Sequence, residues 1–310
     1  MTETLKLKIL FEISTLCLIG TLIGLAVFWF LNWNYQRKHQ VDCPSLEGDK
    51  PILIKPSMKI DGFDLMVVMG IILFFYANQV LAYFASSAEL NQQVVENSEN
   101  KDPSSIGLVD ILLSNIIFLI VGAIIFALAS FSRGRKPKHV FGLRKRSKKY
   151  IIIITMAGMF VAYIAVFLGS VISNFLLSTG EPKKEDLQEI VQTLMTNDDI
   201  SLKIAIALSA IIFAPLIEEV IFRGYLYPVI KRFSHPIFSC VITSLLFAVI
   251  HSNLEGLMPL FLLAIVLTIF YEISKSIWVP ILMHACFNGV NTISILIPVS
   301  YTHLTLPTKA

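Results

Sequence analysis

Charged residues are scarce in this chain. They make up 15% of its 310 residues, whereas an average soluble domain carries about 25%. Hydrophobic residues make up 55%, which is more apolar side chain than a soluble globule of this size can bury. Intrinsic disorder is excluded as well, because disordered chains are polar and poor in aromatic residues, and this chain has 22 Phe. We therefore predict an integral membrane protein built as an all-α, polytopic helical bundle.

Cysteines are also few. The chain has four, at positions 17, 43, 240 and 286, with no CxxC pair and no metal-ligand spacing among them. This pattern excludes a disulfide framework and gives no sign of thiol chemistry. A cleavable signal peptide is not evident either, because the first apolar run is too long and ends in Trp29 and Trp33, as a membrane helix with an aromatic belt does.

Long apolar runs account for most of the chain. A helix that spans a bilayer needs about 20 mostly apolar residues. Runs of this kind occur at roughly 9–33, 62–86, 106–131, 150–178, 201–230, 236–254, 257–273 and 278–299. We therefore predict about eight transmembrane helices, of which the seventh is short enough for a tilted or partial span.

The loops between these runs differ in the sign of their charge. The 132–149 loop is strongly basic, whereas 87–105 and 179–200 are acidic. Lys and Arg mark the cytoplasmic side of a membrane protein, so we expect both termini outside and the following loops inside: 34–61, 132–149, 231–235 and 274–277. We interpret the basic loop as a contact for anionic lipids and not for nucleic acid.

This pattern divides the chain into three segments. Residues 1–149 are predicted to form an N-terminal membrane region with three transmembrane helices and the basic cytoplasmic loop, and residues 150–299 contain the other five helices. Residues 300–310 do not continue the hydrophobic pattern and resemble translated sequencing-adapter sequence. We leave this tail, including His303, out of the functional argument.

Three charged residues lie inside the fifth predicted span. A charge at the centre of a membrane helix costs about 2.5–3.5 kcal/mol, so some interaction must offset them. Glu219 and Arg223 are four residues apart and can pair on one helix face. Glu218 points about 100° away from Glu219, so we expect its carboxyl to face another helix or water. Pro215, just upstream, is expected to bend the helix at this point.

Two further helices place polar side chains within the membrane. Phe247 and His251 are one turn apart in the sixth predicted span, and His284 and Asn288 are one turn apart in the eighth. Counting from the inner ends of their helices, Glu218 lies at ~20 Å and His251 at ~22 Å. The two side chains are therefore expected at the same level in the membrane, where they can meet if these antiparallel helices pack against each other. The same count places His284 at a shallower level and predicts nothing definite about its neighbours.

One free carboxylate, two histidines and an asparagine allow water to attack an amide bond. Glu218 is suited to take a proton from water and return it to the leaving amine, and His251 to hold or polarise that water. His284 and Asn288 are suited to donate hydrogen bonds to the developing oxyanion. The same carboxylate and histidines could instead ligate a divalent metal, and the residue types alone do not separate the two schemes.

These residues resemble the CPBP family of intramembrane proteases, which includes the CAAX prenyl endopeptidases and bacteriocin-processing or immunity proteins. The family motifs EExxxR, FxxxH and HxxxN occur in order as Glu218-Glu219-x-x-x-Arg223, Phe247-x-x-x-His251 and His284-x-x-x-Asn288. The resemblance covers roughly 150–299, which we interpret as the protease domain. The first three helices carry no recognisable motif.

The resemblance implies a role for each matching residue. Glu218 becomes the base that activates water, with His251 assisting, and His284 and Asn288 become the oxyanion group. Glu219, Arg223 and Phe247 become supporting residues. We favour the metal-free scheme, with no cofactor; the alternative is a Zn²⁺ ion held by Glu218, His251 and His284.

The expected function is an intramembrane endopeptidase of a bacterial plasma membrane. Its expected partners are peptides or lipidated proteins within the membrane, either prenylated CAAX-type or bacteriocin-like substrates, and it is not expected to bind nucleic acid. One alternative is a non-enzymatic bacteriocin immunity or binding protein, since the family includes members with that role. Another is a proton-coupled transporter that uses Glu218 as its carrier, although paired helices interrupted by Gly or Pro are lacking.

Overall fold

The computed structural model describes residues 107–131, 146–177, 189–251 and 253–296, together with 67–77, residue 80 and ten positions between 8 and 20. Throughout these residues the regular secondary structure is helical, as predicted. The basic loop from 132 to 145, most of the first two predicted spans and the 300–310 tail lie outside the described residues.

The predicted spans from the third to the eighth correspond to helices. α3 covers Leu108–Phe131, α5 covers Lys148–Leu177, α11 covers Leu257–Ser274 and α12 covers Trp278–Leu296. The fifth span is one helical rod from 200 to 231 with several parts, described below. The sixth is shorter than predicted, because α10 covers only Pro236–Val249.

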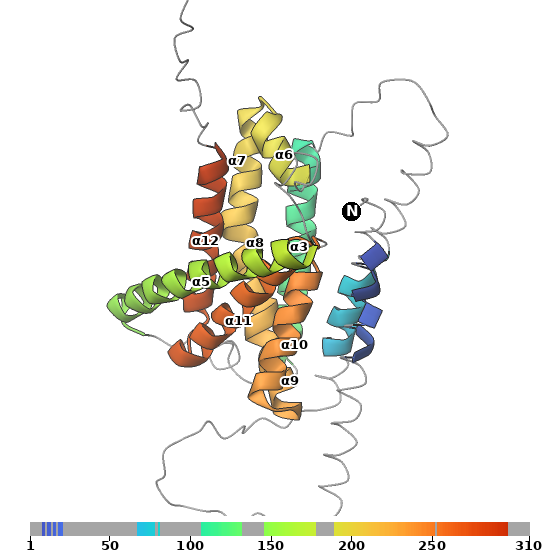
Figure 1. The fold of residues 1–310 in the computed structure, drawn as a ribbon, viewed down its shortest axis with the longest axis vertical. Helices are drawn as coiled ribbons and strands as arrows, with labels where there is room; N and C mark the ends of the chain where they lie inside the picture. Colours follow the sequence, from blue (N-terminus) through green and yellow to red (C-terminus); the bar gives the residue numbers. More distant parts are fainter. Residues whose placement is uncertain are drawn as a thin grey trace, which may run out of the picture.

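Four helices are long and apolar enough to cross a bilayer: Lys148–Leu177, Ile200–Lys231, Leu257–Ser274 and Trp278–Leu296. Shorter apolar helices are found at Phe11–Gly20, Val67–Ala77, Ile111–Ile124 and Pro236–Val249. α6, at Glu189–Thr196, lies at one end of the bundle and the connection from α9 to α10 at the other (Figure 1). This arrangement is that of a multi-pass membrane protein.

The rod from 200 to 231 alternates between two kinds of helix. Regular α-helix forms α7 (Ile200–Leu208), α8 (Ala214–Glu219) and α9 (Tyr227–Phe233). Between them lie two π-helical segments, η2 at Ser209–Phe213 and η3 at Val220–Leu226. The rod begins with an ordinary N-cap, in which the Asp199 side chain accepts a hydrogen bond from the amide of Ser201.

α5 crosses the bundle at a steep angle and packs chiefly on α11 and α12 (Figure 1). The close approach depends on Gly169, since a Cβ atom there would lie 2.7 Å from Cα of Pro259 in α11. The hydrophobic core has two main parts, one under α5 around Leu263, Leu267 and Met283, and a larger one around Phe222 of η3.

Candidate active site

The backbone around the glutamate pair is shaped by two prolines. Each π-helical segment is followed by a proline at the second residue beyond it, Pro215 after η2 and Pro228 after η3. A proline ring in a helix collides with the carbonyl four residues earlier and has no N–H to donate. The amides of Ala214 and Tyr227 accordingly reach back five residues, to the carbonyls of Ser209 and Phe222. The sequence predicted a bend at Pro215, and the structure shows a π-helical widening of the helix at the turn before the glutamates.

This widening leaves one backbone carbonyl without a helical partner. In the five-residue pattern of η2, the carbonyl of Ala210 would accept from the nitrogen of Pro215, which carries no hydrogen. The side-chain amide of Asn288 supplies the missing donor, with Nδ2 at 2.9 Å from that carbonyl oxygen. Asn288 therefore links α12 to the π-helical segment, and its second N–H is still available for another acceptor.

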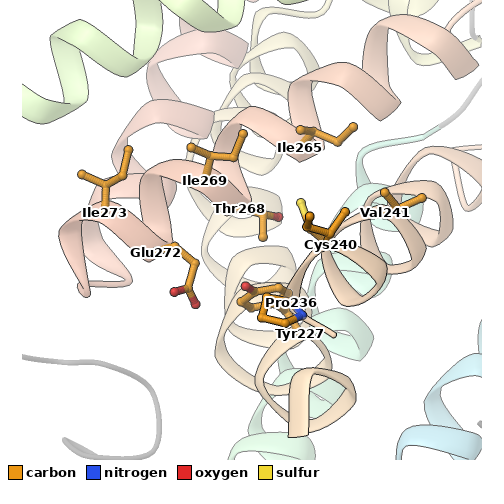
Figure 2. Close-up of a pocket in the computed structure, with 10 residues that line it drawn as sticks. Tyr227, Pro236, Cys240, Val241, Ile265, Thr268, Ile269, Glu272 and Ile273 are labelled. Atoms are coloured by element: carbon orange, nitrogen blue, oxygen red, sulfur yellow. The ribbon is translucent and has the colours of Figure 1, made fainter. Parts of the chain in front are cut away.

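Glu219 and Arg223 form the predicted pair. Arg223 Nη1 donates to Glu219 Oε1 at 2.7 Å, and their side chains are 2% and 0% exposed. Two contacts from α11 hold the guanidinium in place: Nη2 donates to the carbonyl of Ala264 at 2.8 Å, and Nε donates to Thr268 Oγ1 at 3.3 Å. Thr268 extends from α11 toward α10 (Figure 2). These bonds offset the cost of burying the ion pair, which is high when polar groups are left unpaired.

His284 lies between the two glutamates. Its Nδ1 is 2.9 Å from Glu219 Oε1, and its Nε2 is 3.8 Å from Glu218 Oε2. A carboxylate can only accept, so Nδ1 carries the proton that is shared with Glu219, and in a neutral ring Nε2 is the free acceptor. The 3.8 Å separation is too long for a direct hydrogen bond. The simple depth count gave no prediction for His284, but packing of α12 against α8 brings it to this position.

Glu218 differs from Glu219 in its surroundings. Its side chain is 12% exposed, and its Oε2 atom is buried without a hydrogen-bond partner. The carboxyl faces His284 on another helix, as its position on α8 predicted. An unpaired acceptor beside an imidazole nitrogen is a suitable place for a water molecule that bonds both groups.

No hydrogen bond or ion pair joins His251 to Glu218 in the described part of the chain, where Glu218 Oε2 has no partner. α10 ends at Val249, so His251 lies in the turn that follows, and its backbone amide bonds the carbonyl of Ala248. Its Nδ1 is 2.7 Å from the carbonyl of Phe247, which the helix end leaves without a backbone donor. The ring thereby caps its own helix, and in the neutral form its Nε2 is an acceptor.

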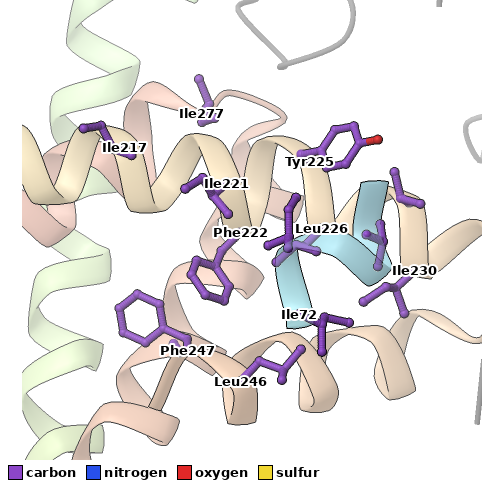
Figure 3. Packing of buried hydrophobic residues seen from close by; sticks show 14 of the residues in the cluster. Ile72, Ile217, Ile221, Phe222, Tyr225, Leu226, Ile230, Leu246, Phe247 and Ile277 are labelled. Carbon is purple, nitrogen blue, oxygen red and sulfur yellow. The ribbon is translucent and has the colours of Figure 1, made fainter. Parts of the chain in front are cut away.

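The Phe247 ring connects the parts of the site. It lies 4.8 Å from the His251 ring, 5.6 Å from the His284 ring and 4.9 Å from the Arg223 guanidinium. On its other side it packs edge-on against Phe222, in the apolar cluster shown in Figure 3. Both histidines are thus held against one fully buried aromatic ring.

The metal alternative requires Glu218, His251 and His284 to converge on one point. Within the described residues, no group of three His, Cys, Asp or Glu side chains is arranged to hold a metal ion. His251 and His284 each use Nδ1 in a bond, to the carbonyl of Phe247 and to Glu219 respectively, so only their Nε2 atoms are left as candidate ligands, and these do not converge with Glu218 in such a group. The three side chains do not fit a metal in this arrangement.

Several residues of the site were not identified from the sequence. Thr268 and the carbonyls of Ala264 and Ala210 belong to no motif, and backbone carbonyls carry no sequence signal. Asn115 of α3 was also missed; its side-chain amide donates a hydrogen bond to Ser209 Oγ, which connects α3 to the start of η2. For Asn115, the only sequence signal was that a polar residue occurs within an apolar run.

Comparisons with known proteins agree with the motifs. Residues 200–290 match the family model described as type II CAAX prenyl endopeptidase Rce1-like. A curated relative, the candidate membrane peptidase YdiL of Bacillus subtilis (strain 168), is 26% identical over 148 residues. That alignment covers 48% of this chain and 58% of the relative. No solved structure matches the chain.

Proposed function

We propose that the protein is an intramembrane endopeptidase of the CPBP type, since residues 200–290 match the Rce1-like CAAX prenyl endopeptidase family model. The observation that carries the proposal is the position of His284, between the paired Glu219 and the unpaired Glu218. A hydrolase needs a base beside an orienting group at a place where water can be held. The described part of the chain has this combination at the end of α8.

The proposed first step is attack by water on the scissile carbonyl carbon. A water that bonds Glu218 Oε2 and His284 Nε2 loses a proton to Glu218 as its oxygen forms the new bond. Glu219 fixes the ring of His284, much as a carboxylate orients the histidine of a hydrolytic triad. In the second step the C–N bond breaks, and the proton on Glu218 passes to the leaving amine.

The proposed oxyanion donor is Asn288. Its Nδ2 group has two hydrogens, of which one is bonded to the carbonyl of Ala210. The other can donate to the developing oxyanion without breaking that bond. His251, held at the end of α10, is proposed to bind the substrate or to assist the water through its Nε2 atom.

The proposed substrates are peptides that are embedded in or attached to the membrane, of the prenylated CAAX type or the bacteriocin-like type. The family match supports the first type, since the matching model is that of a CAAX prenyl endopeptidase. The burial of Glu219 and Arg223 within membrane helices supports a peptide bond that enters the bilayer. We propose the bacterial plasma membrane as the location.

The test uses purified protein in proteoliposomes with quenched fluorescent peptides, both prenylated and unmodified. Glu218→Gln keeps the shape of the side chain but removes the base, so cleavage should fall by about 10²–10⁴-fold. Glu12→Gln, a change to an exposed glutamate far from the site in sequence, is the matched control and should cleave as the unaltered protein does. Equal cleavage by both variants would contradict an enzymatic role for Glu218. It would favour the immunity or binding function if protection against a bacteriocin persisted in the Glu218 variant.

A further inference from the structure

An apolar groove opens between α10 and α11, beside α9 (Figure 2). Its volume is about 450 Å³. Most of its lining is aliphatic or otherwise apolar: Ile237, Cys240, Val241, Ile265, Ile269 and Ile273. From Ile265 to Ile273 the groove follows α11 for roughly 12 Å at 1.5 Å per residue. A groove of this shape suits an extended hydrocarbon chain.

One end of the groove is charged. Glu272 lines it, and the two oxygens of this carboxylate each accept from a lysine: Oε1 from Lys231 at 2.7 Å and Oε2 from Lys275 at 2.5 Å. All three side chains are about one third exposed. The cluster carries a net charge of +1, and each ammonium group has further N–H donors beyond the one given to Glu272. This end therefore favours an anion with several acceptor oxygens.

The charged end lies where a lipid headgroup would be. Lys231 is at the end of the rod from 200 to 231, and Lys275 follows the last residue of α11. Both belong to loops that the charge pattern places on the cytoplasmic side, where anionic lipids are concentrated and basic pockets between helices bind their headgroups. The apolar part of the groove extends from there along α11 toward the middle of the helix.

We propose that this groove binds one anionic phospholipid, with an acyl chain between α10 and α11 and the phosphate at Lys231 and Lys275. A zwitterionic phospholipid could fill the apolar part equally well, but its choline group would meet the two ammonium groups. Thr268 of α11 lines the groove and also accepts a hydrogen bond from Arg223, whereas Glu218 and His284 are not among the residues that line the groove. Its occupant is a bound lipid and not a substrate.

Two native cysteines give a direct test. Cys240 lines the groove, and Cys286 is exposed on α12 outside it. In a Cys17→Ser/Cys43→Ser background, the rate of modification of both thiols by N-ethylmaleimide is followed by mass spectrometry in detergent. Dioleoylphosphatidylglycerol should slow modification of Cys240 at least fivefold more than dioleoylphosphatidylcholine does. Modification of Cys286 should be the same with either lipid.

Charge variants decide whether the lysines select the lipid. Lys231→Gln/Lys275→Gln should raise the phosphatidylglycerol concentration needed for half protection by about thirtyfold, since each of the two lysines near a membrane surface contributes about 1 kcal/mol. Glu272→Gln should lower that concentration, because it releases both ammonium groups. An improvement of this kind does not arise from misfolding. Lys148→Gln/Lys149→Gln, which removes two exposed lysines at the start of α5, is the control and should change nothing.

Each of three results would overturn the proposal. Equal protection by the two lipids would show that the groove is filled without regard to the headgroup. Absence of protection by either lipid would show that neither binds there. An equal loss of protection in the Lys148/Lys149 variant would assign the preference to general surface charge.

Discussion

Glu219 Oε1 is 2.9 Å from Nδ1 of His284, while the same oxygen accepts from Arg223 at 2.7 Å. The second glutamate of the pair thus connects the arginine of its own helix to the histidine of α12. The first glutamate, Glu218, has a buried oxygen with no hydrogen-bond partner. The two adjacent carboxylates are therefore expected to respond differently to the same substitution.

Glu219→Gln should destabilise the protein strongly. It leaves Arg223 buried without its counter-charge, and breaking a buried ion pair in this way costs about 3–5 kcal/mol. Glu218→Gln should change stability by less than about 1 kcal/mol, because no hydrogen bond of its buried oxygen is lost. Unfolding of both variants in the same detergent, followed by thermal scanning, measures the difference. Similar losses in the two variants would show that the carboxylates are equivalent.

Asn288→Ala should remove the donor to the carbonyl of Ala210. A fully buried carbonyl left without a partner costs about 1–3 kcal/mol, and the partly buried carbonyl of Ala210 is expected at the lower end of this range. Pro215→Ala provides a backbone N–H at the position from which that carbonyl could accept. In the Pro215→Ala background, Asn288→Ala should therefore lower the free energy of unfolding by less than it does in the unaltered protein. A double-mutant cycle on unfolding free energies measures this coupling. Strict additivity would contradict the role assigned to Asn288 in the helix.

Thr268→Val should weaken cleavage without abolishing it. The change removes the oxygen that accepts from Arg223 Nε, while the bonds of Arg223 to Glu219 and Ala264 remain. We expect a decrease in kcat of about tenfold with little change in KM, since Thr268 acts through Arg223 and Glu219. Thr268→Ser keeps the hydroxyl and should retain most of the activity. A Ser variant as poor as the Val variant would assign the effect to packing.

Chelators should not reduce cleavage. Within the described residues, Glu218, His251 and His284 do not form a group arranged to hold a metal ion. We expect activity to persist after prolonged dialysis against 1,10-phenanthroline, with no stoichiometric zinc by elemental analysis. Loss of activity on dialysis and its return on addition of Zn²⁺ would favour the metal scheme and a rearrangement of these two rings.

Gly169→Ala should be destabilising by about 1–3 kcal/mol, the usual cost of overpacking. The added Cβ would lie 2.7 Å from Cα of Pro259, and a backbone atom cannot move aside as a side chain does. Gly70→Ala is the matched control, since nothing lies within 4 Å of a Cβ there and alanine favours a helix. Unfolding measurements should separate the two variants. Equal stability would show that α5 and α11 are not in close contact in the membrane.

Much of this protein can be predicted from the composition and spacing of its residues. The apolar runs predict where helices lie because length and hydrophobicity are local properties, and α3, α5, α11 and α12 begin and end within a few residues of the predicted bounds. The pairing of Glu219 with Arg223 is also local, since residues four apart share a helix face. The motifs and the family match support a membrane protease, because they depend only on residue types in order.

The tertiary structure decided which side chains meet. Counting residues along straight helices placed Glu218 and His251 at the same level, but α10 ends two residues before His251, and packing of α12 brings His284 to the glutamates. A depth count assumes that helices are regular and parallel. The prolines in the rod from 200 to 231 and the steep angle of α5 break that assumption, and only packing fixes where the side chains then lie (Figure 1).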